Sequence, residues 1–365
     1  MWQPVSDEPA SMSAARAETS AAAADDTSQR LARLVGAQLA DAQEVRVSGL
    51  TRVFGGNART AFSFDLSYRK PASASGGQDE RMACVLLRHA PGRQISTDVA
   101  QEFRVLRLLH GASALFPAAI AEDGEGRVMG APSIVLQRLP GRTNAVEFLK
   151  SEDTRTAAAL VDQLAAAVAR MHSIDIDAAA LDPALQGLSA REVALHQVTA
   201  WQQTFLAQRL EPLPALSAVF EWLRDRLPAP GRLCLVHGDV RPGNFLYDGG
   251  QVTGLLDWEM AHAGDPLEDL AWIYRPLWSP QRFMDLEAFV RRYAQHARRE
   301  VRMADVVYYR VFSEAKFATI SLTAARAFAT GDTANLRHCD RAATVAPCVL
   351  RCLNWIQAHR ELARA

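Results

Sequence analysis

Residues 235–244 read Leu-Val-His-Gly-Asp-Val-Arg-Pro-Gly-Asn, and residues 255–258 read Leu-Leu-Asp-Trp. The two stretches place Asp239, Asn244 and Asp257 in an order that suits phosphoryl transfer. That reaction needs in-line positioning, a metal ion that neutralises phosphate charge, and one carboxylate that accepts the hydroxyl proton. Asp239 can be this carboxylate, and the other two side chains offer the hard oxygen ligands that Mg²⁺ prefers.

Local sequence signals indicate how these side chains meet. Residues 232–236 form an apolar run that predicts a buried strand, and the glycines and proline that follow predict a loop. Two further strands are expected at 245–247 and 252–256, with an Asp-Gly-Gly hairpin turn between them. The hairpin sets the start of one strand beside the end of the other, so both acidic groups can face one site. The alternative, three polar residues in the loops of an ordinary β-meander, is disfavoured by the complete ordered set.

The motif His-Gly-Asp-x-x-x-x-Asn, followed by a strand and an Asp, resembles the signature of aminoglycoside phosphotransferase-like kinases, which are distant relatives of protein kinases. Two further stretches are similar to the branch that includes the kinase-like domains fused to some acyl-CoA dehydrogenases. They are Asp-Trp-Glu-Met-Ala at 257–261 and Gly-Asp-Pro-Leu-Glu-Asp-Leu-Ala at 264–271. The resemblance extends from near Leu31 to the C-terminus.

This resemblance implies an α+β, protein-kinase-like fold with two lobes. A small antiparallel-sheet N-lobe would occupy residues 29–139, and a larger, mainly helical C-lobe would occupy residues 140–365. ATP and Mg²⁺ would be the cofactors, and a small-molecule hydroxyl group would be the acceptor. By the same resemblance Asp239 is the catalytic base, and Asn244 and Asp257 are the metal ligands.

The periodicity of apolar residues also differs between the two expected lobes. Alternation predicts strands in the first lobe, and helical spacing predicts helices in the second. The expected strands lie at 45–50, 62–68, 82–88 and 133–137. The expected helices lie at 31–39, 97–109, 154–172, 191–209 and 215–227, and over most of 286–363. A nucleotide is expected in the cleft between the lobes.

Two segments of the first lobe are candidates for nucleotide binding. Gly55, Gly56 and Asn57 stand between two expected strands, where glycines let backbone N–H groups approach phosphate oxygens closely. An ordinary hairpin turn is the alternative. The adenine base is expected near Gln137 and Leu139, where backbone groups can bind it.

A kinase-type site also needs a cation on the phosphates and a carboxylate that orients this cation. The family usually has Lys at this position of the third strand, whereas here Arg88 ends the strand, and Glu102 is its candidate partner. Arg binds phosphate through a fork of donors, so the exchange is chemically tolerable. The alternative places Arg88 in solvent and Glu102 on a solvated helix face.

Other charged residues near the motif have several possible roles. Arg241 can neutralise the transferring phosphoryl group, or it can pair with Asp265 or Asp269. Those two acids stand near a helix start, where carboxylates cap N–H groups, so we expect them to brace the loop. His237 is expected to fix the loop backbone rather than to transfer protons.

The sequence leaves the acceptor open. Five side chains are possible lining residues, although each more often belongs to a packed core: His196, Trp201, Trp272, Tyr274 and Trp278. A polycationic aminoglycoside favours an acidic pocket, whereas five arginines lie between positions 291 and 302. This suits an anionic or acyl-type acceptor, such as a hydroxyacyl-CoA-like metabolite, although a solvated basic helix face is an alternative.

Other protein classes are alternatives to a small-molecule kinase. A non-catalytic, nucleotide-binding pseudokinase stays open because of Arg88, as does an antibiotic (aminoglycoside or macrolide) or choline/homoserine-type kinase. A hydrolase, a zinc peptidase and a P-loop kinase are disfavoured. The chain has no Gly-x-Ser-x-Gly, no His-Glu-x-x-His and no Gly-x-x-x-x-Gly-Lys motif.

The composition narrows the class further. The chain has 365 residues, of which 49% are hydrophobic, enough for the cores of two lobes. A net charge of −1 does not indicate a nucleic acid or an anionic membrane as partner, and no apolar run is long enough to span a bilayer. Residues 1–28 predict a disordered tail rather than a signal peptide. The oligomeric state stays open.

Five cysteines form an odd set without a disulfide framework and fit a reducing cytoplasm, where we expect the protein. A metal site at His338, Cys339, Cys348 and Cys352 is disfavoured because no Cys-x-x-Cys pair is present. Buried free thiols are expected there instead.

Overall fold

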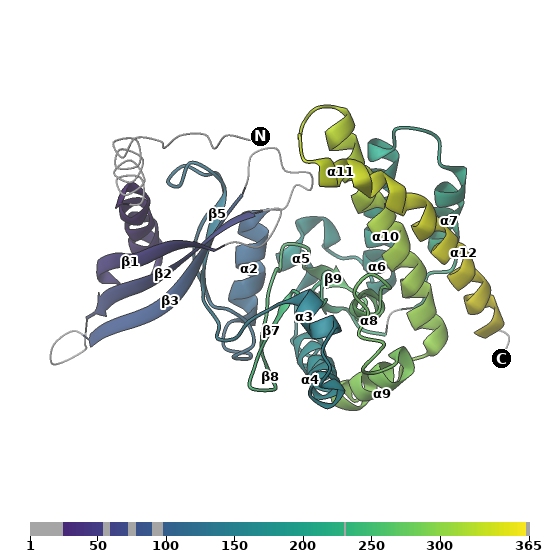
Figure 1. The fold of residues 1–365 in the computed structure, drawn as a ribbon, viewed down its shortest axis with the longest axis horizontal. Coiled ribbons are helices and arrows are strands. Elements are labelled where there is room, and N and C mark those ends of the chain that lie inside the picture. The colour runs from purple at the N-terminus through teal and green to yellow at the C-terminus, as the bar shows by residue number, and fades with distance from the viewer. Residues whose placement is uncertain (1–24, 54–58, 72–77, 90–97, 230, 363–365) are drawn as a thin grey trace, which may run out of the picture. The chain divides into compact units, whose positions relative to one another are not determined.

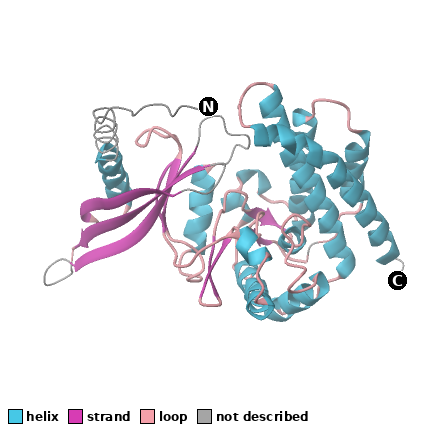
Figure 2. Cartoon of the chain, in the orientation of Figure 1, coloured by secondary structure: helices cyan, strands magenta, loops and turns pink. Residues whose placement is uncertain are grey.

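The computed structural model describes residues 25–53, 59–71, 78–89, 98–229 and 231–362. The chain divides into two compact units, which Figure 1 shows as ribbons. Unit 1 comprises Met1–Pro91 and Ala118–Arg138, and unit 2 comprises Gly92–Pro117 and Leu139–Ala365. In their described parts, strands dominate unit 1 and helices dominate unit 2 (Figure 2).

Unit 1 contains a five-stranded antiparallel sheet with the order β1-β2-β3-β5-β4. Its strands are β1 (Gln43–Val53), β2 (Arg59–Lys70), β3 (Gln78–His89), β4 (Ala119–Asp123) and β5 (Ser133–Gln137). The four strands expected in this region are confirmed. The sequence did not predict β4, because its residues are buried almost throughout and show no polar alternation.

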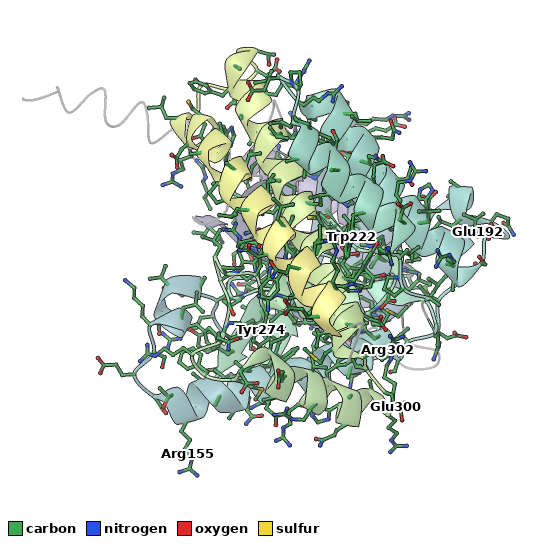
Figure 3. The ribbon with its side chains drawn as sticks, turned by 90° about the vertical axis from the view of Figure 1, so that its right-hand side faces the viewer. Arg155, Glu192, Trp222, Tyr274, Glu300 and Arg302 are labelled. Atoms are coloured by element: carbon green, nitrogen blue, oxygen red, sulfur yellow. The ribbon has the colours of Figure 1, made fainter. Side chains whose placement is uncertain are left out.

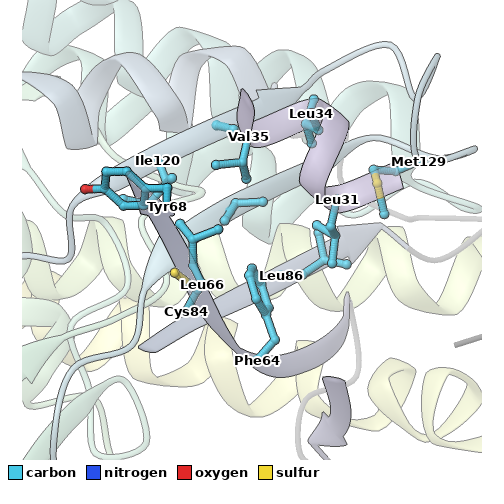
Figure 4. Packing of buried hydrophobic residues seen from close by; sticks show 12 residues of the cluster. Leu31, Leu34, Val35, Phe64, Leu66, Tyr68, Cys84, Leu86, Ile120 and Met129 are labelled. Atoms are coloured by element: carbon cyan, nitrogen blue, oxygen red, sulfur yellow. The ribbon is translucent and has the colours of Figure 1, made fainter. Parts of the chain in front are cut away.

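A helix over 25–38 packs its apolar stripe on this sheet. Leu31, Leu34 and Val35 follow helical spacing, and Phe64 and Leu66 follow strand alternation. Figure 4 shows these side chains converging in one cluster, in which each is at most 3% exposed. Two simple periodicities therefore build the core of unit 1.

Two boundaries in the structure differ from those expected from the sequence. Residues 25–28 are helical, so the predicted tail does not extend to residue 28, and residues 1–24 lie outside the described residues. The helix α2 (Val99–Leu109), which we expected in the N-lobe, belongs to unit 2. The proposed lobe limits at residues 29, 139 and 140 stay predictions.

Unit 2 is mainly helical, as expected. Its further helices are α3 (Ala145–Leu149), α4 (Thr154–His172), α5 (Ala178–Leu181), α6 (Ala190–Gln208), α7 (Pro214–Asp225), α8 (Leu267–Ile273), α9 (Leu286–Ala297), α10 (Met303–Ala329), α11 (Leu336–Asp340) and α12 (Val345–Leu362). None of the helices in the described part of the chain has both the length and the apolar character that crossing a membrane requires.

The long helix α10 is the centre of unit 2. It packs against α6, α8 and α12, and most of its residues are buried, including the charged Glu314 and Lys316. Tyr308 of α10 stacks on Trp222 of α7, whose place is marked in Figure 3, with ring centroids 5.7 Å apart. The Tyr308 hydroxyl also donates to the Leu223 carbonyl at 2.7 Å. Burial on all sides explains why α10 lacks a single apolar stripe.

Two small antiparallel pairs lie within unit 2. Strand β6 (Cys234–Val236) pairs with β9 (His262–Gly264), and β7 (Phe245–Asp248) pairs with β8 (Gln251–Leu255). The three strands expected here are confirmed. In the predicted turn, Gly249 and Gly250 have φ values of 51° and 77°, a combination that suits a tight hairpin turn.

Truncating Phe64 tests whether the cluster in Figure 4 stabilises unit 1. Phe64 is 1% exposed, so Phe64→Ala leaves a cavity and should lower the free energy of unfolding by about 3–5 kcal/mol. The measurement is urea unfolding followed by circular dichroism. Val53→Ala is the control, because Val53 is 45% exposed in the same sheet. Similar small losses in both variants would contradict this role of Phe64.

Candidate functional site

Asp239 lies in the 237–244 loop between β6 and β7, where three side chains hold its carboxylate. The Trp272 indole Nε1 donates to Oδ1 at 2.8 Å, and Asn244 Nδ2 donates to Oδ2 at 2.7 Å. Arg241 Nε lies 3.1 and 3.2 Å from the two carboxylate oxygens. The Asp239 side chain is still 13% exposed, so the carboxylate is fixed in orientation and remains accessible to a ligand.

The hairpin brings Asn244 and Asp257 close together. Beyond the Phe245–Leu255 pair, Leu256 N donates to Asn244 O at 2.8 Å. Asp257 follows with a φ of 69°, a left-handed conformation that Asp tolerates better than most residues with a side chain. The convergence expected from the sequence is therefore present in the backbone.

The two residues fit a magnesium site in their chemistry. Asn244 turns its amide nitrogen to Asp239, so its amide oxygen, the atom that a magnesium ion would bind, faces away from that carboxylate. The described residues contain no group of three or more His, Cys, Asp or Glu side chains that could hold a metal ion. A magnesium ion here would be bound by Asn244, Asp257 and phosphate oxygens. Magnesium sites in phosphate-transferring enzymes commonly combine few protein ligands with oxygens of the substrate phosphates.

Asp269, the third residue of α8, fixes the start of the 237–244 loop. Its Oδ2 accepts the His237 backbone N–H at 2.8 Å, and its Oδ1 accepts the Gly238 N–H at 2.9 Å. His172 of α4 donates from Nε2 to the same carboxylate at 3.0 Å. Burial raises the pKa of Asp269, but the hydrogen bond and charge of His172 outweigh this and lower the pKa below its usual value. The geometry matches the bracing role expected for Asp269.

His237 supports the same loop with its ring. Its Nε2 lies 3.0 Å from the Leu256 carbonyl, and its Nδ1 accepts the Asp239 backbone N–H at 3.3 Å. Burial lowers the pKa of His237, so the neutral ring donates from Nε2 and accepts at Nδ1. The Trp258 ring lies 4.5 Å from the His237 ring and is also buried. His237 therefore holds the loop backbone by hydrogen bonds, as the sequence indicated, and Trp258 packs against its ring.

Lys316 of α10 holds the loop from its carbonyl side. Its buried ammonium donates to the Gly238 carbonyl at 2.8 Å and to Glu268 Oε1 at 2.9 Å, and it lies 4.6 Å from the Trp272 ring. Gly238 has a φ of 79°, and a Cβ on it would lie 2.6 Å from the Met260 carbonyl oxygen, so only glycine fits. The sequence analysis missed Lys316. It is one of three lysines in a chain rich in arginine, and this rarity was the available signal.

Glu268 links Lys316 to a second cation. His262 Nε2 lies 3.2 Å from Glu268 Oε2, opposite the contact with Lys316. Burial alone raises the pKa of Glu268, but Lys316 and His262 lower it to about 2. Conversely, burial disfavours the charged ring of His262, but Glu268 raises the pKa of His262 above its usual value. A compensated ionic cluster therefore lies beneath the 237–244 loop.

Arg241 does not make either of the two pairings considered from the sequence. Arg241 forms an ion pair with Asp239, and Asp265 instead caps the Leu267 N–H at 2.9 Å. The Arg241 guanidinium lies 5.6 Å from the Trp278 ring, and the buried Arg275 guanidinium lies 5.1 Å from that ring. Sequence spacing did not show that Asp239 itself would hold Arg241, or that Arg275 would lie near by.

The residues expected to bind the nucleotide are spread over both units. Gly55, Gly56 and Asn57 lie outside the described residues. Arg88 lies in β3 of unit 1, paired with Ser133, whereas Glu102 lies in α2 of unit 2. Glu102 is 2% exposed, so the alternative of a solvated helix face is wrong. The pairing of Arg88 with Glu102 stays a prediction.

Two residues near the expected adenine position have packing contacts. Gln137 Oε1 accepts the Ala118 N–H at 3.4 Å within unit 1. Leu139 is buried in unit 2 against Gly254, where an added Cβ would lie 2.5 Å from the Leu139 side chain. These contacts leave the base-binding role of this segment as a prediction.

Some expectations outside the loop need correction. Cys339 is exposed, whereas the other four cysteines are buried and free, so burial was predicted wrongly for this residue alone. Some of the arginines between 291 and 302 make ion pairs with acids of unit 2. Arg291 lies 3.9 Å from Glu287, and Arg292 pairs with Asp162 at 2.7 Å on α4. The link between these arginines and the acceptor stays a prediction.

Residues 74–304 match the profile of the phosphotransferase enzyme family. Over 194 residues the chain is 27% identical to acyl-CoA dehydrogenase family member 10 of Mus musculus, a match that covers 52% of this chain and 18% of that protein. The chain therefore spans less than a fifth of the length of this relative.

Solved structures support the fold. A protein of Ralstonia eutropha JMP134 assigned to the aminoglycoside phosphotransferases has a TM-score of 0.66 at 17% identity, covering 90% of this chain and 98% of that chain. A thermostable mutant of aminoglycoside phosphotransferase APH(4)-Ia, in a ternary complex with AMP-PNP and hygromycin B, has a TM-score of 0.54 at 17% identity, covering 85% and 94%. The predicted α+β, protein-kinase-like fold is confirmed.

Replacing Glu268 with Gln tests the ionic cluster. Folding lowers the Glu268 pKa from 4.5 to about 2, so the ionised carboxylate stabilises the fold above the higher value, and this contribution is lost as the pH falls toward the lower one. We expect Glu268→Gln to lower the free energy of unfolding by on the order of a few kcal/mol near neutral pH. The difference from wild type should shrink in acid.

The measurement is urea unfolding at several pH values. Glu287→Gln on α9 is the control, because the Glu287 side chain is 73% exposed. A Glu268→Gln effect that stays constant from neutral pH down to about pH 3 would contradict the assigned cluster.

Proposed function

The chain belongs to the phosphotransferase enzyme family, and we propose that it is an ATP- and Mg²⁺-dependent kinase for a hydroxyl group of a small molecule. The observation that carries this proposal is the Asp239 carboxylate, which Trp272, Asn244 and Arg241 hold in one orientation while it stays accessible. A fixed, accessible carboxylate is what a hydroxyl nucleophile needs as a proton acceptor.

In the proposed reaction, the hydroxyl oxygen of the acceptor bonds to the γ-phosphorus of ATP. At the same time, the Asp239 carboxylate accepts the proton of that hydroxyl group. The bond from that phosphorus to the bridging oxygen breaks, and ADP leaves. Arg241, which pairs with Asp239, would neutralise charge on the transferring group. Magnesium, when held by Asn244 and Asp257, would neutralise phosphate charge. The AMP-PNP bound to the structurally similar APH(4)-Ia mutant supports ATP as the donor.

We propose that the residues indicated by the sequence bind the nucleotide. Gly55, Gly56 and Asn57 would cover the phosphates, and Arg88 would bind them. Burial of Glu102 in α2 supports a role for its carboxylate beyond solubility, because buried acids require compensation. Gln137 and Leu139 mark the proposed adenine position.

The proposed acceptor is anionic, with a hydroxyacyl-CoA-like metabolite as the leading candidate. The guanidinium groups of Arg241 and Arg275 both lie within 6 Å of the Trp278 ring. The Trp278 indole donates to the Trp272 backbone carbonyl, and the Trp272 indole donates to Asp239. Each guanidinium also pairs with an acid, Arg241 with Asp239 at 3.1 Å and Arg275 with Glu314 at 3.1 Å, so among the described residues this aromatic setting offers no unpaired acid to a polycationic antibiotic. The similarity to an acyl-CoA dehydrogenase family member supports the same choice.

The cytoplasm is the proposed location, since four of the five cysteines are buried free thiols. The alternative of a nucleotide-binding pseudokinase rests on Arg88 at the position where the family usually has Lys. A screen for ATP-dependent phosphorylation separates the two and identifies the acceptor. It should include hydroxyacyl-CoAs, aminoglycosides, macrolides, choline and homoserine.

Asp239→Asn tests the proposed base. The amide cannot accept the proton, so turnover on the acceptor found in the screen should fall by about 10²–10⁴-fold, while AMP-PNP still binds. Turnover is measured by ADP release and nucleotide binding by calorimetry. Asp248→Asn is the matched control, because Asp248 is exposed in the neighbouring hairpin. Retained turnover in Asp239→Asn would exclude Asp239 as the base.

Asn244→Ala and Asp257→Ala test the proposed metal ligands. Each should weaken magnesium-dependent AMP-PNP binding by about 10–100-fold or more, the loss that even an outer partner of a metal ligand can cause. Binding measured without magnesium should change little. Calorimetry that gives the same magnesium dependence in wild type and variants would remove both residues from the proposed site.

A further inference from the structure

A cavity of about 390 Å³ lies in unit 2 at the C-terminal ends of α4 and α9, beside the segment that leads into β6. This volume is within the range of about 300–1,000 Å³ that small-molecule sites occupy. Glu300, marked in Figure 3, follows the end of α9. The polar lining residues are His172, Ser173, Arg232, Tyr293, Arg299 and Glu300.

A second cavity of about 620 Å³ shares Ala169, Ser173 and Ala297 with the first. Its lining adds Arg170 and Arg298 and no acidic residue. The two linings together contain four arginines and one acid, Glu300. One of the arginines, Arg232, also contacts Asp175 at 3.0 Å, but that acid is 97% exposed and leaves the guanidinium largely in solvent. Such a lining favours an anionic ligand, because guanidinium forks match phosphate and carboxylate oxygens.

The wall of the first cavity is connected to the 237–244 loop by hydrogen bonds. The Tyr293 hydroxyl lies 2.9 Å from His172 Nδ1, and His172 Nε2 lies 3.0 Å from Asp269 Oδ2. The Asp269 carboxylate in turn accepts the backbone N–H groups of His237 and Gly238. Tyr293, His172 and Asp269 are all buried, so each bond in this relay is shielded from water.

We propose that the first cavity binds a small molecule bearing phosphate or carboxylate groups, and that Tyr293, His172 and Asp269 transmit its binding to the 237–244 loop. The cavity lining does not include Asp239, Asn244 or Asp257, so this site is separate from the proposed phosphoryl-transfer site. A ligand that restrains Tyr293 and His172 stabilises the arrangement in which Asp269 holds both loop amides. The proposal concerns binding and does not depend on turnover.

Calorimetry on the full chain tests the binding. Inorganic phosphate and succinate are the phosphate and carboxylate probes, glycerol is the neutral control, and saturating AMP-PNP with magnesium occupies the proposed nucleotide site. One or both anions should bind, and Arg232→Gln combined with Arg299→Gln should weaken that binding at least about tenfold. Arg291→Gln combined with Arg302→Gln removes the same charge from exposed positions and should leave the affinity unchanged.

The outcomes separate this proposal from the proposed function. Equal anion affinity in wild type and in the Arg232/Arg299 variant, or no anion binding at all, would overturn the cavity site. If AMP-PNP itself does not bind, the proposed function fails, and the dependence of anion binding on these two arginines still tests the cavity.

Hydrogen exchange tests the relay. When the anion is bound, the His237 and Gly238 amides that bind Asp269 should exchange at least about fivefold more slowly. This factor is at the lower end of the coupling commonly measured between two sites of one protein. Tyr293→Phe keeps the ring and should keep anion binding, but it should lose this slowing. If Tyr293→Phe does not fold, His172→Gln replaces it. The same slowing in these variants, or none in wild type, would contradict the relay.

Discussion

The buried carboxylate of Asp269 is the interaction on which the 237–244 loop depends. Taking a charge out of water costs several kcal/mol unless hydrogen bonds and opposite charge replace the lost hydration. Here two backbone N–H groups and His172 supply that replacement. Each of the two amides points at a separate carboxylate oxygen, which restricts the backbone conformation at His237 and Gly238. The orientation of the next residue, Asp239, is restricted as a result.

Lys316 completes this constraint from the other side of the peptide. Asp269 accepts the N–H of Gly238, and Lys316 donates to the carbonyl of Gly238, so Gly238 is held by an anion and a cation at once. The anion comes from α8 and the cation from α10, two helices that pack together. Displacement of either helix would therefore move the carboxylate of Asp239, the proposed base.

The sequence predicted the residues of this site better than the residues that hold the loop in place. The reason is that the first set depends on local contacts, whereas the second depends on contacts between residues far apart in the sequence. The hairpin that brings Asn244 near Asp257 is local, so turn residues and strand alternation predict it. Lys316 reaches the loop from a distant helix, and His172 reaches Asp269, which holds the loop, from another; no local pattern predicts such contacts. Trp272 appeared only as a possible lining residue, although it donates directly to Asp239. The strand β4 was missed because it is buried almost throughout, which removes the alternation that identifies a strand.

The scarcity of lysine has a practical consequence for labelling this protein. The chain contains Lys70 in unit 1 and Lys150 in unit 2, both exposed, whereas Lys316 is 1% exposed beneath the loop. Amine-reactive dyes should therefore modify one lysine in each unit and spare the lysine that supports the loop. The native chain thus offers one exposed side-chain amine in each unit for a fluorescent donor and acceptor, so energy transfer could measure the distance between these two positions without an introduced cysteine.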